Sequence, residues 1–291
     1  MHGLWALAGA IVLQVVLAPA ALAQRELTEE EARTRIPHYD AMRQAAARGR
    51  ELYLYDQAAW HATDRFREEF DFENASFMRG YIVVPRDDGR LDPVFYGEVD
   101  GRLVEVARYT VDGRRIEEGG LLPENARPPL SEIAMRMANA RQTAAEEMRA
   151  RKYALCANPP VNTLVLPPRE DGSITVYILT PPTASDKYPM GGHYRFDLAA
   201  DGKVRDSRRF MNTCFDAAFG QAAGAPAGST LSSIVLSHLL DPQPTEIHVF
   251  ASYYLPVTLM VATTENRLMW SVRQGSIGYI GSLDELRRDG D

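Results

Sequence analysis

The candidates for chemistry lie in the last third of the chain, where histidines stand close to carboxylates. His193, Arg195 and Asp197 occupy alternate positions, so on a β-strand their side chains share one face. The apolar residues between them then face the opposite side. A strand of this kind would present an imidazole, a guanidinium and a carboxylate together.

A second group of polar residues lies between positions 238 and 248. His238 is followed by Asp241, and Glu246 and His248 are two residues apart, so the latter pair shares a face if the segment is a strand. If these groups converge with His193, they could bind a metal ion or supply a general base. The alternative is that the histidines are separate and each is satisfied by local hydrogen bonds.

The sequence contains none of the motifs that mark common catalytic machinery. It has no G-x-S-x-G, G-x-x-x-x-G-K, H-E-x-x-H or S-x-x-K pattern. The glycines of Gly275–Gly281 come late in a β-like segment with no helix after them, which argues against a phosphate loop. We therefore predict no cofactor, and no metal unless the histidines converge.

Composition and charge are those of a globular protein. The 291 residues are 45% hydrophobic, enough for one large domain or two of ordinary size. There are 32 basic and 39 acidic residues, for a net charge of −7, and no run of five like charges. We therefore predict no nucleic-acid partner.

The N-terminus has the pattern of a signal peptide. An apolar stretch over Leu4–Leu17 is followed by Pro19 and by Ala21-Leu22-Ala23, an A-x-A cleavage site. We predict a signal peptide over residues 1–23, with cleavage between Ala23 and Gln24. The apolar stretch is too short to cross ~30 Å of hydrocarbon at about 1.5 Å per residue. The sequence thus predicts a soluble exported protein without a transmembrane segment, periplasmic in a Gram-negative host.

Export decides how the two cysteines are interpreted. Cys156 and Cys214 are the only cysteines, with neither a C-x-x-C spacing nor partners for a zinc site. In an oxidising compartment a disulfide between them is the favoured interpretation. A nucleophilic cysteine is the alternative, and it would have to stay reduced outside the cytoplasm.

The first elements along the chain are predicted to be helical. Thr28 begins a capping box for a helix over roughly Glu29–Arg48, which Pro37 kinks or divides and Gly49 ends. A short extended piece and a second helix capped by Asp56 should follow. From residue 80 the apolar period becomes two, which is typical of strands.

Two antiparallel meanders are predicted from this period and from Asp-Gly turns. The expected strands of the first are Tyr81–Val84, Val94–Gly97 and Leu103–Thr110. The expected strands of the second are Asn162–Leu166, Ile174–Leu179, His193–Leu198 and Val204–Phe210. Between the meanders Ser131 should cap a helix whose apolar face lies on a sheet and is formed by Ile133, Met137, Ala140, Ala144 and Met148.

The final segment is predicted to be β-rich. Thr245–Ile280 should form four short strands that complete the second sheet, after a loop or lid over Phe219–Thr230. The phrase Pro-Arg-acid-Asp-Gly stands at Pro85–Gly89 and again at Pro168–Gly172. Each copy is expected to close one strand and to open the next, so the order of elements repeats.

This repetition predicts an α+β fold of antiparallel meanders packed with amphipathic helices, from two related helix-plus-meander modules. Chance is the alternative, because Pro, Asp and Gly are common in all hairpin turns. The expected division is an N-terminal module over residues 24–127, a connecting helix over 128–155 and a C-terminal β domain over 156–291.

Several stretches resemble an uncharacterised family of exported proteobacterial proteins. They are NTLVLPP, GGHYRFDLAADG, SRRF and LSHLLDPQPTEIHVFAS between Cys156 and Ile280, and YDQAAWHATD at Tyr55–Asp64. The resemblance implies a secreted context and a domain limit near residue 155. It implies no activity.

Two classes of function follow. The favoured one is a non-catalytic envelope protein whose sheet faces, or whose Tyr-rich edge at Ala251–Pro256, bind a protein, a peptide or a cell-wall component. The alternative is a periplasmic hydrolase or metal-dependent enzyme that uses His193, His238, Glu246 and His248. Convergence of these four side chains in one concave site would favour the enzyme.

Overall fold

The computed structural model describes residues 28–156, 161–220 and 231–288. The predicted signal peptide with its cleavage site at Ala23 and Gln24, and most of the loop predicted before residue 230, lie outside the described residues. The described chain has the expected α+β fold. Its helices are α1 Glu29–Arg35, α2 Tyr39–Glu69, α3 Glu132–Ala150, α4 Glu246–Ser252 and α5 Leu283–Arg288, with short 3₁₀ turns at Phe72–Phe77 and Glu124–Ala126.

The strands form three four-stranded sheets and one short ribbon within the described residues. The first sheet contains β1 Met78–Pro85, β2 Leu91–Val99, β3 Arg102–Asp112 and β4 Arg115–Leu121. The second contains β5 Asn162–Val165, β6 Ile174–Leu179, β8 Tyr194–Leu198 and β9 Val204–Arg209. The third contains β11 Ser233–His238, β12 Thr258–Thr263, β13 Leu268–Arg273 and β14 Ser276–Ser282, and the ribbon pairs β7 Lys187–Pro189 with β10 Asp216–Ala218.

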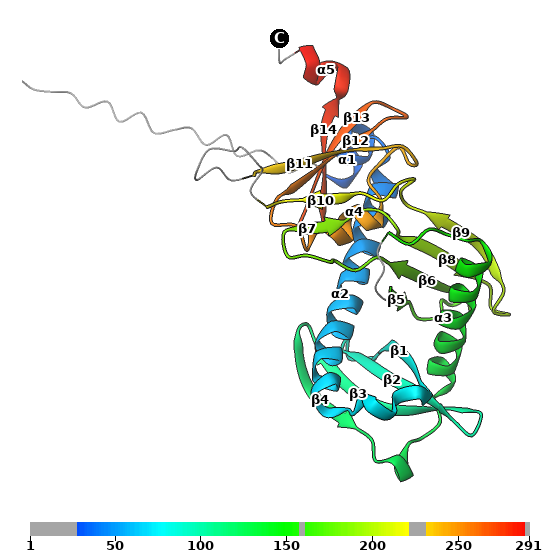
Figure 1. Ribbon diagram of the computed structural model, residues 1–291. Coiled ribbons are helices and arrows are strands. Elements are labelled where there is room, and N and C mark those ends of the chain that lie inside the picture. The colour runs from blue at the N-terminus through cyan, green and yellow to red at the C-terminus, as the bar shows by residue number, and fades with distance from the viewer. Residues whose placement is uncertain (1–27, 157–160, 221–230, 289–291) are drawn as a thin grey trace, which may run out of the picture.

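Helix α2 is the axis of the molecule. It runs from the β11–β14 sheet past the β5–β9 sheet to the β1–β4 sheet, and it contacts elements of all three (Figure 1). The capping box at Thr28 is confirmed. Helix α1 ends before Ile36-Pro37, and α2 begins after His38, whose backbone has a left-handed conformation. The prediction that Gly49 ends a helix is wrong, because α2 continues for 31 residues without interruption.

Gly49 lies within α2 because it is the point where α4 crosses the helix. A Cβ atom at this position would stand 2.5 Å from the Cβ of Val249 and 2.7 Å from the carbonyl oxygen of Glu246. Only glycine lets the two backbones approach so closely. The extended piece predicted before Asp56, and the capping role of Asp56, are therefore also wrong: Asp56 lies inside the helix and is buried.

The repeated phrase marks the same turn in two sheets. The Gly89 N–H donates to the Arg86 carbonyl oxygen at 3.1 Å, and the Gly172 N–H donates to the Arg169 carbonyl oxygen at 2.8 Å. Both turns join the first and second strands of an antiparallel sheet whose strands follow in sequence order. A helix precedes each sheet, α2 in one case and α3 in the other, so the predicted repetition of element order is confirmed.

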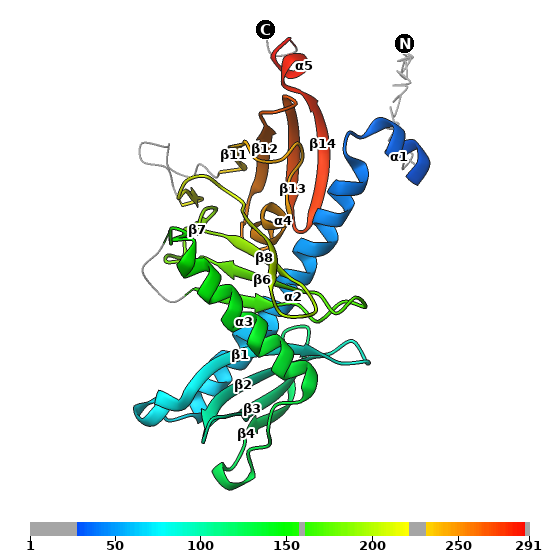
Figure 2. The same ribbon diagram turned by 90° about the vertical axis from the view of Figure 1, so that its right-hand side faces the viewer.

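Helix α3 covers one face of both of these sheets (Figure 2). The Ser131 hydroxyl accepts the N–H of Ala134, as the predicted cap requires. Met137, Ala144 and other residues of its apolar face are buried against strands of both sheets. The prediction is wrong for Ile133, which is exposed. This face therefore joins the two meanders instead of covering only one.

The C-terminal segment differs from the prediction. It does not complete the second sheet but forms a third, in which β11 pairs parallel with β12 and the remaining pairs are antiparallel. Residues 246–252 form helix α4 instead of a strand. All seven are buried, the polar Glu246, His248 and Ser252 included, so the segment has no exposed polar face from which a helical period could be read.

The predicted disulfide is confirmed. Cys156 and Cys214 are bonded, with an S–S distance of 2.09 Å and a Cα–Cα distance of 5.3 Å. The bond joins the chain after α3 to the segment between β9 and β10. It therefore ties the entry of the second meander to the exit of its last strand.

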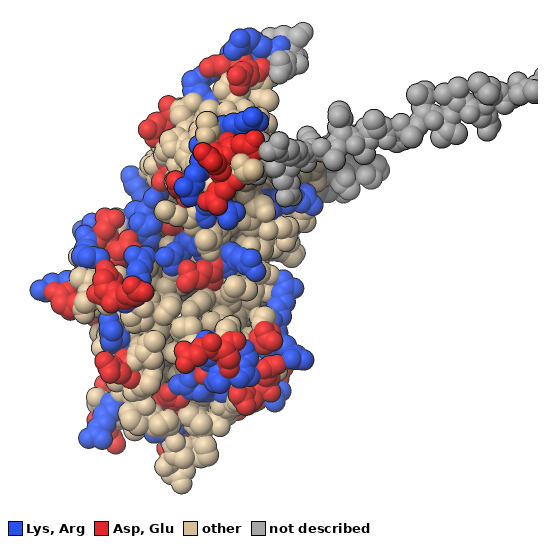
Figure 3. Space-filling model, turned by 180° about the vertical axis from the view of Figure 1, so that it is seen from behind, with Lys and Arg blue, Asp and Glu red and all other residues tan. Residues whose placement is uncertain are grey.

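Charged side chains of both signs are interspersed on the face seen in Figure 3. No broad patch of only positive or only negative side chains covers that face. This agrees with the composition, in which 32 basic residues nearly balance 39 acidic ones. Among the described helices, none is long and apolar enough to span a bilayer.

The helix crossing at Gly49 can be tested by Gly49→Ala. Alanine favours a helix by about 1 kcal/mol over glycine, but overpacking a tight contact costs about 1–3 kcal/mol. We expect the variant to have a lower free energy of unfolding in urea titrations. Ala47→Gly, at an exposed position two residues away, is the matched control for helix propensity alone. A Gly49→Ala protein more stable than the wild type would contradict the crossing.

Removing the disulfide should destabilise the protein. The bond closes a loop of 58 residues, for which the chain-entropy model gives about 4 kcal/mol of stabilisation. We expect the double variant Cys156→Ser/Cys214→Ser to unfold at a clearly lower urea concentration, and the wild type in a reductant to behave in the same way. Equal unfolding midpoints for the oxidised wild type and the double variant would refute this contribution.

Candidate functional site

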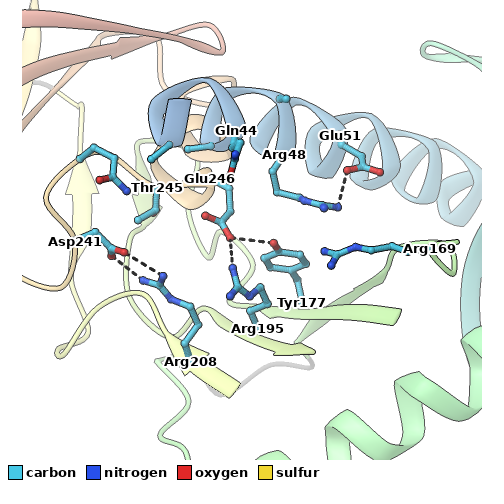
Figure 4. Close-up of a pocket in the computed structure, with 14 residues that line it drawn as sticks. Gln44, Arg48, Glu51, Arg169, Tyr177, Arg195, Arg208, Asp241, Thr245 and Glu246 are labelled. Carbon is cyan, nitrogen blue, oxygen red and sulfur yellow. Dashed lines mark hydrogen bonds and ion pairs between the residues drawn. The ribbon is translucent and has the colours of Figure 1, made fainter. Parts of the chain in front are cut away.

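A cavity of about 680 Å³ lies between the first half of α2, the second sheet and the start of α4 (Figure 4). Its volume is in the range of small-ligand sites. Polar and charged side chains dominate its lining: Gln44, Arg48, Glu51, Arg169, Tyr177, Arg195, Arg208, Asp241, Gln243, Thr245 and Glu246. Four of these are arginines, which outnumber the three carboxylates.

The alternation predicted for β8 places one of these arginines. Tyr194, Phe196 and Leu198 are buried in the core beneath α3, so Arg195 faces the opposite side and lines the cavity. Tyr177 on the neighbouring strand β6 faces the same side. The second sheet thus presents an apolar face to α3 and a polar, arginine-bearing face to α2 and α4.

A chain of hydrogen bonds fixes the arginines on this face. The Arg195 Nε donates to Asp197 Oδ2 at 3.0 Å, and its Nη1 donates to Glu246 Oε1 at 3.1 Å. Thr175 Oγ1 donates to Asp197 Oδ1 at 2.8 Å and accepts from the Arg169 Nη2 at 3.2 Å. Two strands and the turn before them therefore hold the guanidinium groups in place.

Glu246 connects this network to helix α4. Its Oε1 also accepts the Tyr177 hydroxyl at 3.0 Å. Burial, and then the Glu246 carboxylate beside it, raise the pKa of Tyr177 well above its usual value. The hydroxyl therefore stays protonated and remains a donor. Figure 4 shows Glu246 reaching down from α4 to Tyr177 and Arg195.

An ion pair between Arg208 and Asp241 forms another wall of the cavity. Arg208 donates from Nη1 and Nη2 to the two oxygens of Asp241, at 3.1 and 2.7 Å, and its guanidinium lies 4.6 Å from the centre of the Phe210 ring. His238 Nε2 lies 2.9 Å from Asp241 Oδ2. Burial alone would raise the pKa of Asp241, but the hydrogen bonds from His238 and Arg208 lower it well below its usual value.

The histidines predicted as candidates are all buried, with exposed fractions of 1% for His193, 0% for His238 and 1% for His248. His238 and His248 are neighbours, with ring centres 4.6 Å apart and planes at 83°. His248 Nδ1 accepts the Thr245 N–H at 3.0 Å, which closes a capping box at the start of α4. These two histidines therefore do not line the cavity; they hydrogen-bond to Asp241 and Thr245, which do.

His193 makes its own hydrogen bonds, apart from the carboxylates. Its Nδ1 accepts the Thr180 N–H at 3.3 Å, and its Nε2 lies 2.8 Å from the Pro189 carbonyl oxygen. Within the described residues, no group of three or more His, Cys, Asp or Glu side chains could hold a metal ion. The candidate set His193, His238, Glu246 and His248 is thus divided: Glu246 faces the cavity and the histidines lie in the interior.

The arginines retain capacity to bind an anion. Each guanidinium has five N–H donors, and the side-chain contacts above use only one or two of them per residue. Arg48 pairs with Glu51 at 2.7 Å. Arg169 forms no ion pair within the described residues, and its guanidinium donates only to Thr175 Oγ1, although its charge acts on the nearby Asp171. Guanidinium groups match carboxylate and phosphate oxygens in geometry, so the cavity is suited to a ligand with such groups.

Sequence reasoning found Arg195, Asp241 and Glu246 but missed Arg48, Arg169 and Arg208. The missed arginines stand on α2, on a turn and on β9, far apart in the sequence, and only the fold brings them together. One signal was available: Arg169 belongs to the repeated turn phrase.

Comparison with known proteins gives no match: no family model, no curated protein and no solved structure resembles the chain. The resemblance to a family of exported proteins therefore stays a prediction. The function has to be argued from the geometry of the cavity.

The buried histidines predict a pH-dependent stability. Burial lowers the pKa of His193 from 6.5 to about 4, so between these values the unfolded chain binds a proton that the folded chain does not. This contribution is fully present above pH 6.5 and is lost as the pH falls to about 4, with a size of about 3 kcal/mol. His193→Gln should lose less stability than the wild type between pH 7 and pH 4 in urea titrations. An equal loss in both proteins would contradict this assignment.

Proposed function

We propose that this chain is an exported envelope protein that acts as a non-catalytic binding module. Its ligand carries carboxylate or phosphate groups and enters the cavity between α2, α4 and the second sheet. The observation that supports this most is the convergence of four arginines, from four separate elements, on a cavity of about 680 Å³. Arg169 is the arginine on which we expect the ligand to depend most, because within the described residues it forms no ion pair and donates a single side-chain hydrogen bond.

The surrounding network supports a binding role. Arg195 and Arg208 are held by carboxylates on one side, so their remaining donors are positioned before a ligand arrives. Such preorganisation lowers the entropy cost of binding. The disulfide and the predicted signal peptide favour an exported location, where a ligand from the cell envelope would be met.

The hydrolase alternative has less support. Its three histidines are buried, so none of their rings can contact a substrate in the cavity. His238 and Asp241 form a hydrogen-bonded pair, but Asp241 also holds Arg208 through both of its oxygens. This geometry orients an arginine and does not activate a nucleophile.

Calorimetric titration with inorganic phosphate, citrate and triglutamate tests the proposal. We expect at least one probe to bind saturably at low ionic strength and to bind more weakly as salt is added. Arg169→Gln should weaken that binding at least about tenfold, because a hydrogen bond to a charged group contributes about 1.5–3 kcal/mol.

The matched control is Arg209→Gln, because Arg209 is exposed on the same sheet but does not line the cavity. It should bind the probes as the wild type does. If none of the three probes binds, or if both variants weaken binding equally, the cavity is not an anion site.

A further inference from the structure

A second cavity, of about 690 Å³, lies beside the later half of α2. One stripe of the helix, which includes Asp56, Trp60 and Arg67, forms one wall. The opposite walls come from β1, α3, the ends of β5 and β6, β7, α4 and Tyr254, which lies two residues beyond the end of α4. The first cavity uses positions 41–51 of α2 and this one uses positions 56–67, so the two are separate.

Five aromatic rings line this cavity: Trp60, Tyr81, Tyr188, Phe250 and Tyr254. Tyr188 and Tyr254 are stacked with ring centres 5.3 Å apart, and the Phe250 ring meets Tyr254 edge-on at 5.3 Å. These contacts hold three rings in fixed positions. Trp60 is 52% exposed although it is the largest apolar side chain on this part of the helix. An exposed indole at a cavity wall offers a flat surface to a ligand.

A single carboxyl group stands among these rings. Asp56 is 9% exposed, and its Oδ2 accepts the hydroxyl of Tyr254. Gln57 Nε2 donates to the same hydroxyl oxygen at 3.1 Å, which directs the Tyr254 proton toward Asp56. Asp56 Oδ1 and the Tyr188 hydroxyl have no hydrogen-bond partner within the described residues. Burial raises the pKa of Asp56 to about 6, and burial, followed by the charge of Asp56, raises the pKa of Tyr188 well above its usual value. Both residues line this cavity.

Two arginines complete the lining. Arg141 Nη1 donates to the Arg79 carbonyl oxygen at 3.0 Å, and its Nε is buried without a partner within the described residues. Arg67 is exposed on α2. The cavity therefore contains both unpaired donors and unpaired acceptors, between aromatic faces.

These features discriminate among ligands. A hydrocarbon would leave Asp56 Oδ1, the Tyr188 hydroxyl and the remaining N–H donors of Arg141 without a partner, at a cost of about 1–3 kcal/mol per group. An organic cation would suit the rings but meets two arginines, and an anion would suit the arginines but meets Asp56 and the negative faces of the rings. A neutral ring with an apolar face and hydroxyl groups at its edge satisfies every group.

We propose that this aromatic cavity binds a saccharide, with a sugar face stacked on Trp60 and sugar hydroxyls hydrogen-bonded to Asp56, Tyr188 and Arg141. This goes beyond the anion site, because it rests on other residues and another ligand. A protein with both cavities holds a sugar and an acidic group at separate places along one helix.

Tryptophan fluorescence tests the proposal directly. Beyond the predicted signal peptide, tryptophan occurs only at positions 60 and 270, and Trp270 is fully buried, so a ligand-induced change reports on Trp60. Chitotriose, cellotriose and maltotriose are the probes, with calorimetry as the second measurement. We expect saturable binding of at least one sugar. Trp60→Ala should weaken calorimetric binding at least tenfold, and the isosteric Asp56→Asn should weaken it while preserving the fold.

Leu54→Ala is the matched control, because Leu54 is an exposed apolar residue of α2 outside the cavity. It should bind sugars as the wild type does, and so should Arg169→Gln, which separates this proposal from the anion site. Lack of binding by all three sugars would overturn the saccharide assignment. So would binding of choline or benzoate to this cavity with loss in Trp60→Ala and no binding of sugar.

Discussion

The close approach of α2 and α4 at Gly49 is the contact on which both cavities depend. With a larger residue there, α4 would move away from α2 by the space of at least a methyl group. Glu246 at the start of α4 then could not hold Tyr177 and Arg195 at 3.0 and 3.1 Å. Tyr254, just beyond the end of α4, could not reach Asp56 on α2. A seven-residue helix thus supplies groups to two sites, and one glycine sets its position.

The two cavities offset the desolvation cost of their buried polar groups in different ways. In the first, each of Arg195 and Arg208 is balanced by a carboxylate, so the charges are desolvated in pairs. In the second, one carboxyl group is surrounded by tyrosine rings and hydroxyls, and no residue of opposite charge pairs with it within the described residues. The first cavity is therefore rich in charged groups, and the second has more ring surface and fewer charged groups. We expect their ligands to differ accordingly.

Local signals in the sequence predicted the parts of the fold that local geometry determines. The Asp-Gly turns, the cap at Ser131 and the alternation along β8 were all readable, because each depends on residues close in sequence. Helix α4 was not, since a short, fully buried run with Ile, Val and Phe has the composition of a strand. Gly49 was misread for a related reason: its neighbour in space is Val249, and no local pattern shows a contact 200 residues away. The arginine cavity had the same difficulty, because Arg48, Arg169 and Arg208 meet only in the folded chain.

The long sequence separation between α2 and the residues that pack on it also affects how a newly synthesised chain folds. The hydroxyl of Tyr254 that meets Asp56 lies 198 residues further along the chain. Non-local contacts of this kind slow folding, because the chain must close a long loop before it gains the contact energy. Helix α2 is synthesised early, and its second half can pack on β1–β4 soon afterwards. The part of α2 that contacts α4 stays uncovered until the last third of the chain has been delivered. During that interval the uncovered face of α2 is accessible to proteases, so rapid closure of the C-terminal segment over the helix limits cleavage.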